Sequence, residues 1–150
     1  MWLGAVVVGA MGLGLAVLPP FVSPSLRAVL MEGFASVCHQ WPGRSPHLHG
    51  VQLAVCDRCL GIYAGLLVGA VATRWGRAGW RRIRPWGLLL LLVLVAPAAV
   101  DWVGPVVGLW ESVPVSRSLT GLVAGMGGGG FVVDRLLASI RSATPSADGE

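Results

Sequence analysis

The sequence predicts an all-α, polytopic integral membrane protein with four transmembrane helices and a short amphipathic interfacial helix. Hydrophobic residues make up 55% of the 150 residues and charged residues only 12%, whereas soluble domains carry about 25% charged residues. The apolar residues occur in long runs, and polar or arginine-rich segments separate these runs. This composition places the chain in a lipid bilayer.

The apolar runs predict spans at about residues 2–22, 57–74, 85–103 and 118–138. The first run is long enough to cross a hydrocarbon core of about 30 Å at about 1.5 Å per residue. No basic segment precedes it, so we interpret it as a retained span and not as a signal peptide. The other runs fall slightly below about 17 residues when bounded by charge, and re-entrant hairpins are their competing interpretation. Residues 1–141 then form a single membrane domain, and residues 142–150 form a flexible tail.

An amphipathic helix is predicted over residues 24–38, between the first two spans. Four residues recur at every fourth position on one of its faces: Leu26, Leu30, Phe34 and Cys38. This pattern is typical of a helix that lies in the membrane interface. Residues 38–59 follow as a loop rich in cysteine and histidine.

The arginines predict the orientation of the spans. Five of them lie in the link between the second and third spans: Arg74, Arg77, Arg81, Arg82 and Arg84. Under the positive-inside rule this link and both termini are cytoplasmic, and residues 38–59 are extracytoplasmic. Because orientation explains the basic cluster, we expect no nucleic-acid partner.

Glycines recur at every fourth position in two of the runs, as Gly61, Gly65 and Gly69 and then as Gly121 and Gly125, with a glycine run at 127–130. Small residues at this spacing let helices approach closely in lipid. We therefore expect these faces to pack helices together. A homo-oligomer or a partner membrane subunit would use the same glycine-rich faces.

All cysteines and histidines of the chain lie within one short segment: Cys38, His39, His47, His49, Cys56 and Cys59. A structural zinc site commonly takes four Cys or His ligands, and a Cys-x-x-Cys pair supplies two of them from one turn. Cys56 and Cys59 fit that pair, and Cys38 is a third thiolate. The histidines are candidates for the fourth position, and water in that position would make the metal catalytic. We predict zinc or another transition metal as the cofactor.

The same thiols support a second interpretation, a membrane thiol-disulfide oxidoreductase. Cys56 and Cys59 lie at a predicted helix N-terminus, where the helix dipole and Arg58 favour the thiolate form. Cys38 would then be the exchanging thiol, and a membrane quinone would accept or supply the electrons. A third interpretation is a non-catalytic accessory subunit or small-solute transporter. Whether the protein is an enzyme stays open at this point.

Several motifs resemble those of an uncharacterised family of small polytopic prokaryotic membrane proteins. They are Cys38-His39-Gln40, Arg44-Ser45, Cys56-Asp57-Arg58-Cys59-Leu60-Gly61-Ile62-Tyr63, and downstream Asp101, Glu111-Ser112, Arg117 and Thr120-Gly121. The resemblance implies the cytoplasmic membrane of a prokaryote and favours His39 as the fourth ligand over His47 and His49. Val113-Pro114 departs from the polar residues that the family more often has there.

A set of charged residues is predicted to support this site from the same side of the membrane: Arg44, Arg58, Asp101, Glu111 and Arg117. Polar groups at membrane depth are costly, so they tend to be functional or paired. The sequence therefore predicts a small integral membrane protein with a Cys/His metal site on its extracytoplasmic face.

Overall fold

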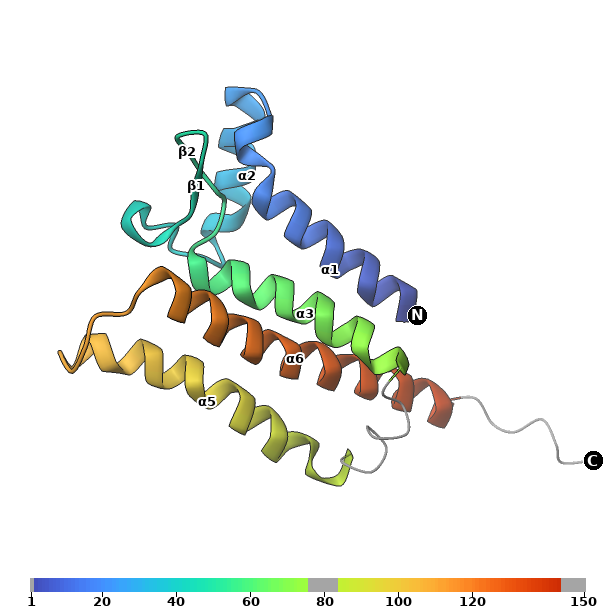
Figure 1. Ribbon diagram of the computed structural model, residues 1–150. Coiled ribbons are helices and arrows are strands. Elements are labelled where there is room, and N and C mark those ends of the chain that lie inside the picture. Colours follow the sequence, from blue (N-terminus) through green and yellow to red (C-terminus); the bar gives the residue numbers. More distant parts are fainter. Residues whose placement is uncertain (1, 76–83, 144–150) are drawn as a thin grey trace, which may run out of the picture.

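The computed structural model describes the chain from residue 2 to 75 and from 84 to 143, and within these ranges it is mainly helical. The helices are α1 (Trp2–Val17), α2 (Pro24–Ala35), α3 (Asp57–Trp75), α5 (Gly87–Val106) and α6 (Pro114–Ala143), with a short antiparallel hairpin of β1 (His47–Leu48) and β2 (Val51–Gln52). In Figure 1, α6 lies between α3 and α5, and α1 lies along the other side of α3. The starts of α3 and α6 and the end of α5 meet at one end of this bundle.

The glycines of α3 and α6 bring these two helices into direct backbone contact. A Cβ atom added to Gly61 or Gly65 would overlap a carbonyl oxygen of α6, and one added to Gly121 or Gly125 would overlap a carbonyl oxygen of α3. Only glycine leaves room for this approach. Both glycine-rich faces thus pack against each other within one chain, and a homo-oligomer or partner subunit stays a prediction.

The prediction of four transmembrane helices is wrong. Among the described residues, one helix is both long and apolar enough to cross a membrane, and it is α5. Helix α1 has only 16 residues, because Pro19 and Pro20 follow it and have no backbone N–H to continue its hydrogen bonds. Helices α3 and α6 are long enough, but their glycines and terminal charged residues lower their mean hydropathy. The predicted helical class is confirmed, since the described residues are mostly helical and add only the short hairpin β1–β2.

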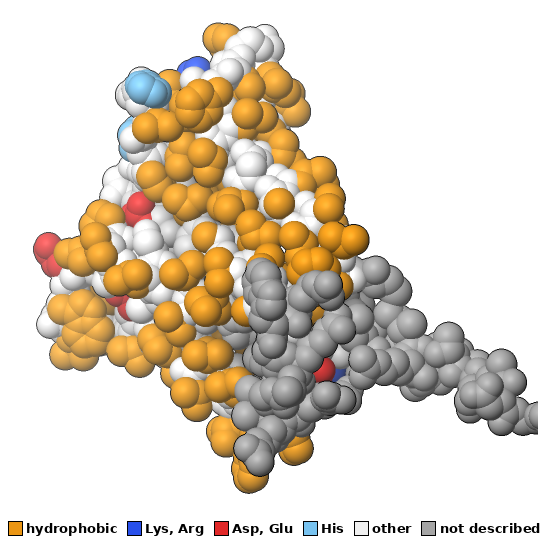
Figure 2. Space-filling view, turned by 45° about the vertical axis from the view of Figure 1, so that its right-hand side comes forward, with side chains coloured by type: hydrophobic (Ala, Val, Ile, Leu, Met, Phe, Trp, Pro, Cys, Tyr) orange, Lys and Arg blue, Asp and Glu red, His pale blue; other side chains and the backbone are white. Residues whose placement is uncertain are grey.

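Apolar side chains nevertheless dominate the outside of the molecule. Figure 2 shows them spread over much of the described surface, with few charged groups among them. On α1 and α5 the exposed ones include Leu3, Val7, Val8, Leu88, Leu89, Leu92 and Val93. A soluble monomer rarely exposes a contiguous apolar surface of this extent, so this surface fits contact with lipid.

The helix predicted over residues 24–38 is present as α2, which begins with Pro24 in its first turn and ends at Ala35. Its Phe34 and the following Cys38 pack inward, whereas Leu26 is exposed. Most of the predicted cytoplasmic loop, with Arg77, Arg81 and Arg82, lies outside the described residues, as does most of the predicted tail. The orientation of the chain therefore stays a prediction.

Candidate metal centre

The three cysteines form one cluster where α2 ends and α3 begins. Cys38 follows the last turn of α2, Cys56 directly precedes α3, and Cys59 lies in its first turn. The three Sγ atoms all lie within 4.8 Å of one another. No two of them form a disulfide; all are free thiols, with Cys38 buried and the other two half-buried.

Backbone and apolar contacts hold the cluster together. The backbone N–H of Cys56 donates a hydrogen bond to Sγ of Cys38 at 3.2 Å. Ala16, Cys38 and Val55 form a buried core, against which Phe34 and Tyr63 pack. The two rings meet edge to face, with centroids 5.9 Å apart. The thiols are thus fixed by side chains from α1, α2 and α3.

Gln40 joins the segments that carry the cysteines. Its side-chain amide donates hydrogen bonds to the backbone carbonyl oxygens of Met31 (2.7 Å) and Ala54 (2.8 Å). The backbone carbonyl oxygen of Gln40 accepts a hydrogen bond from the side-chain amide of Gln52 (2.6 Å). The φ of Gln40, 48°, lies in the left-handed region, which few non-glycine residues adopt. No role for Gln40 was predicted from the sequence, although its place in the Cys38-His39-Gln40 motif was the available signal.

The thiols influence one another's ionisation. The hydrogen bond from the Cys59 thiol is the largest cause that lowers the pKa of Cys56 to about 5, and it outweighs the burial that opposes it. The same interaction, together with burial, raises the pKa of Cys59 above its ordinary value. The interaction between the two therefore favours the thiolate form at Cys56 and the thiol form at Cys59.

The histidines lie apart from this cluster in the structure. His39 follows Cys38 but is exposed, and it does not belong to the group of clustered metal-ligand atoms among the described residues. His47 lies in β1, and its Nδ1 is 2.9 Å from the carbonyl oxygen of Ser45. His49 lies in the hairpin turn with φ 52°, and its ring meets Phe21 edge to face.

A charged network adjoins the cluster at the starts of α3 and α6. Arg58, between Cys56 and Cys59, forms an ion pair with the buried Asp101 of α5. Asp101 also accepts hydrogen bonds from the hydroxyls of Ser112 (3.1 Å) and Ser116 (2.8 Å). No sequence pattern indicated that Ser116 belongs to the site, whereas Ser112 is part of the Glu111-Ser112 motif.

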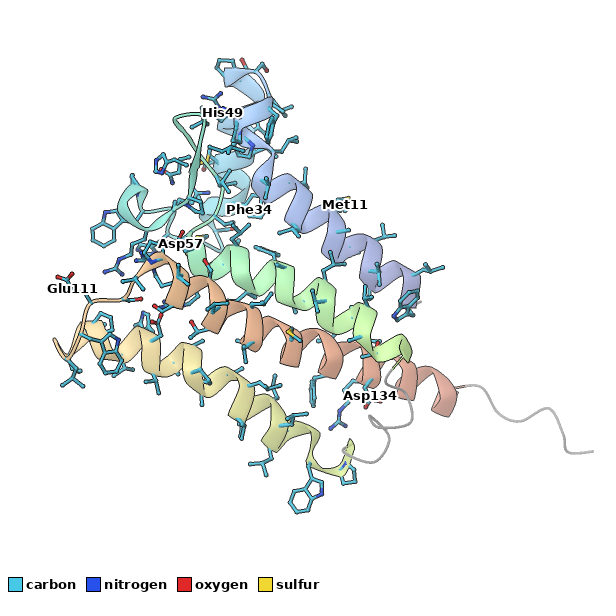
Figure 3. All side chains as sticks on the ribbon, in the orientation of Figure 1. Met11, Phe34, His49, Asp57, Glu111 and Asp134 are labelled. Atoms are coloured by element: carbon cyan, nitrogen blue, oxygen red, sulfur yellow. The ribbon has the colours of Figure 1, made fainter. Side chains whose placement is uncertain are left out.

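A second ion pair joins Arg117 of α6 to Asp57 of α3, at 3.2 Å. Both side chains are buried. Arg44 is exposed and stacks over Trp41, with its guanidinium carbon 5.3 Å from the ring centroid. Glu111 points away from the bundle in Figure 3, while Asp57 lies at the meeting point of α3 and α6. Among the predicted supporting residues, Asp101 and Arg117 are thus buried, each in a separate ion pair. Arg44 and Glu111 are exposed.

This network borders a cavity of about 620 Å³ between the end of α5 and the starts of α3 and α6. Its lining residues are Arg44, Arg58, Asp101, Trp102, Pro105, Val106, Gly108, Trp110, Glu111, Ser112 and Arg117. All five of the predicted supporting charged residues therefore share one cavity. The cysteines are not among its lining residues, so the chain holds two neighbouring sites.

Comparison with known proteins supports the resemblance seen in the sequence. The family described as "Predicted membrane protein (DUF2085)" matches residues 38–131. An uncharacterized protein of Methanocaldococcus jannaschii is 37% identical over 107 residues, which are 70% of this chain and 64% of the relative. An uncharacterized protein of Methanothermobacter thermautotrophicus is 34% identical over 63% of this chain and 82% of its own length. The chain thus spans slightly less than two thirds of the first relative, and no solved structure matches it.

Proposed function

Because the chain belongs to the DUF2085 family of predicted membrane proteins, we propose that it binds a transition-metal ion at a membrane, with zinc as the first choice. The ligands are the thiolates of Cys38, Cys56 and Cys59. The observation that carries this proposal is the clustering of their three Sγ atoms within 4.8 Å. Sulfurs that share one zinc ion at about 2.3 Å lie roughly 3.8 Å apart, so small side-chain movements suffice.

The burial of the cluster also supports a metal. Three thiolates in an apolar setting would repel one another, and a divalent cation compensates this charge. We propose His39 as the fourth ligand, because it is adjacent to Cys38 and its exposed side chain can turn. With His39 turned away, a water molecule or an external ligand would complete the tetrahedron, which is the arrangement of catalytic zinc sites.

We propose the extracytoplasmic face of a prokaryotic cytoplasmic membrane as the location of this site, with both termini cytoplasmic. The distribution of arginine supports this orientation, since α3 begins beside the cysteines and runs to the opposite end of the bundle. The link that follows α3 in the sequence is rich in arginine, and positively charged loops favour the cytoplasm. Labelling of an introduced cysteine at each end with a membrane-impermeant reagent tests it, in a variant whose native cysteines are replaced by serine. Equal labelling of both ends in intact cells would contradict it.

Metal analysis of the full-length protein in a mild detergent tests the proposal. We expect close to one zinc per chain in the wild type and loss of the metal in Cys59→Ser and Cys38→Ser. Cobalt should replace zinc and give the thiolate charge-transfer absorption and intense visible bands of a tetrahedral site. His49→Ala is the matched control, because His49 lies in the hairpin, and it should bind as the wild type does.

The His39→Ala variant separates the two coordination schemes. Weaker metal binding and altered visible cobalt bands indicate that His39 is a ligand, whereas unchanged spectra indicate an external fourth ligand. The metal proposal itself fails if the folded wild type takes up neither zinc nor cobalt, or if Cys59→Ser binds cobalt with the wild-type spectrum.

Thiol redox chemistry is a second candidate function, favoured by the low pKa of Cys56. The Cys56 thiolate and one of the other thiols would be oxidised to a disulfide. A membrane quinone would take up the two electrons, one proton from that thiol and one proton from solvent, and become quinol. Counting thiols before and after addition of a soluble quinone tests this reaction. Loss of two thiols with formation of one quinol supports it, and a constant count of three contradicts it.

A further inference from the structure

The arginine-lined cavity beside the thiol cluster is shaped by the end of α5. Gly108 has φ 74° and ends the helix, and the backbone N–H of Leu109 then bonds to the carbonyl oxygen of Gly104 at 2.9 Å. The indole of Trp110 folds back against Gly104, where an added Cβ would overlap the ring. The segment that follows α5 thus forms an apolar wall of the cavity, and it brings the Ser112 hydroxyl within hydrogen-bond distance of the Asp101 carboxylate.

Three arginines line this cavity, and two of them have an N–H donor that makes no hydrogen bond within the described residues. Arg58 uses Nη2 for Asp101, and Arg117 uses Nη2 for Asp57. The Nε atoms of both are buried and have no hydrogen-bond partner in the described part of the chain. Arg117 as a whole is only 8% exposed. A buried guanidinium donor without a partner is costly, and an anion in the cavity would lower this cost by electrostatic attraction to the guanidinium groups.

The acidic groups at the cavity do not compete for these donors. Asp101 already accepts hydrogen bonds from Arg58, Ser112 and Ser116, and Glu111 is exposed at the rim. Helices α3 and α6 both start here, and helix N-termini add positive potential. The cavity is therefore suited to an oxyanion.

The size and lining of the cavity narrow the class of ligand. A volume of about 620 Å³ lies in the range of small-molecule sites, about 300–1,000 Å³, and exceeds what an inorganic anion fills. Trp102, Pro105, Val106 and Trp110 give it an apolar side opposite the arginines. Arginine forks match the oxygens of phosphate groups. The ligand should therefore join a phosphate to an organic part.

We propose that this cavity binds an organic phosphate, with Arg44, Arg58 and Arg117 on the phosphate and Trp102 and Trp110 against the organic part. The phosphate group is supplied by a phospholipid or by a soluble phosphate ester. This site is separate from the cysteine cluster, and the proposal does not rest on metal binding. A Cys59→Ser variant that has lost its metal should still bind the phosphate.

Tryptophan fluorescence of the full-length protein, purified in phosphate-free detergent buffer, provides the test. The probes are dihexanoyl phosphatidylglycerol, glycerol 3-phosphate, inorganic phosphate, and dihexanoylglycerol as the phosphate-free comparator. We expect a saturable change with at least one organic phosphate and none with dihexanoylglycerol. Binding of phosphatidylglycerol alone identifies a lipid headgroup, whereas equal binding of glycerol 3-phosphate identifies a soluble ester.

Substitutions at the arginines locate the binding. Arg117→Gln should weaken it about tenfold or more, because a charge-assisted hydrogen bond is lost. The exposed Arg44 can change without affecting the core, so Arg44→Gln should weaken binding severalfold even if Arg117→Gln fails to fold. Arg135→Gln, on the far part of α6, is the matched control and should bind as the wild type. Equal affinities in the wild type and in Arg44→Gln and Arg58→Lys would overturn the proposal, as would saturable binding of dihexanoylglycerol.

Discussion

The backbone N–H of Cys56 donates a hydrogen bond to Sγ of Cys38, although the two residues are 18 positions apart. This bond fixes the end of α2 against the start of α3. Hydrogen bonds of this kind orient metal ligands and tune them. The thiols are thus arranged before any ion binds, which lowers the ordering cost of binding.

Gln40 maintains this arrangement from outside the cluster, so we expect Gln40→Ala to loosen it. The variant loses the hydrogen bonds to Met31 and Ala54, and these are worth about 1–3 kcal/mol together. Unfolding in detergent should show this loss of stability. Cys38 should also become more accessible to a thiol reagent in the metal-free protein.

Ser36→Ala is the control for this change. The Ser36 hydroxyl also bonds to a backbone carbonyl, that of Gly33, but it is exposed. We expect no change in the reactivity of Cys38 there. Equal reactivity of Cys38 in the wild type and in Gln40→Ala would show that Gln40 does not hold the cluster.

Residue spacing predicted the cysteine cluster. Cys56 and Cys59 lie at the start of α3 and Cys38 follows α2, so the three thiols meet once the end of α2 packs against the start of α3. The glycine repeats likewise indicated that Gly65 and Gly125 serve close helix packing, and the structure places them in contact. The cysteine spacing and the glycine repeats are both local sequence patterns, and each of them requires only one helix contact to produce the observed arrangement.

The predictions failed or stayed untested where several effects compete. The count of four spans relied on apolar runs, but the glycines that allow α3 and α6 to touch also reduce their mean hydropathy. The position of His39 depends on a loop whose backbone turns at Gln40 with a positive φ, and no periodicity indicates such a turn. Ser116 enters the site only because α5 and α6 lie side by side.

The contact of α3 with α6 gives a direct test at Gly65. We expect Gly65→Ala to destabilise the protein by about 1–3 kcal/mol or more, because the new Cβ would overlap the carbonyl oxygen of Leu122 and backbone cannot yield as a side chain does. Unfolding by a denaturing detergent, followed by circular dichroism, measures this change.

Gly14→Ala is the matched control for Gly65→Ala. Gly14 also lies within a helix, and nothing comes within 4 Å of its added Cβ. Alanine is the better helix former by about 0.5–1 kcal/mol, so this variant should be as stable as the wild type or slightly more stable. A similar loss of stability in both variants would mean that helix contact is not the cause.

The ion pair of Arg58 and Asp101 joins α3 to α5, and we expect it to stabilise the folded protein at this end of the bundle. Asp101→Asn leaves the half-buried guanidinium of Arg58 without its counter-charge. Breaking a fully buried pair costs about 3–5 kcal/mol, so this pair should cost less but still measurably lower the stability. Glu111→Gln, which removes an exposed acid from the same cavity, should leave the stability unchanged. An Asp101→Asn variant as stable as Glu111→Gln would contradict a structural role for the pair.

The ionisation of Cys56 predicts how the metal-free protein reacts with iodoacetamide as pH changes. Only the thiolate reacts, and the pKa of Cys56 is about 5, so alkylation should be near its full rate at pH 7 and should decline as pH falls through 5. An ordinary cysteine, with a pKa of about 8.5, would instead react slowly at pH 7.

Substitution of Cys59 tests the cause of this low pKa. Cys59→Ala removes the hydrogen bond that stabilises the Cys56 thiolate, so the midpoint of alkylation should move to higher pH. Cys59→Ser keeps a hydroxyl donor, and its midpoint should lie between those of the wild type and Cys59→Ala. Mass spectrometry of the peptide that contains Cys56 measures each rate, and a midpoint near pH 8.5 in the wild type would show that the cluster holds no thiolate at neutral pH.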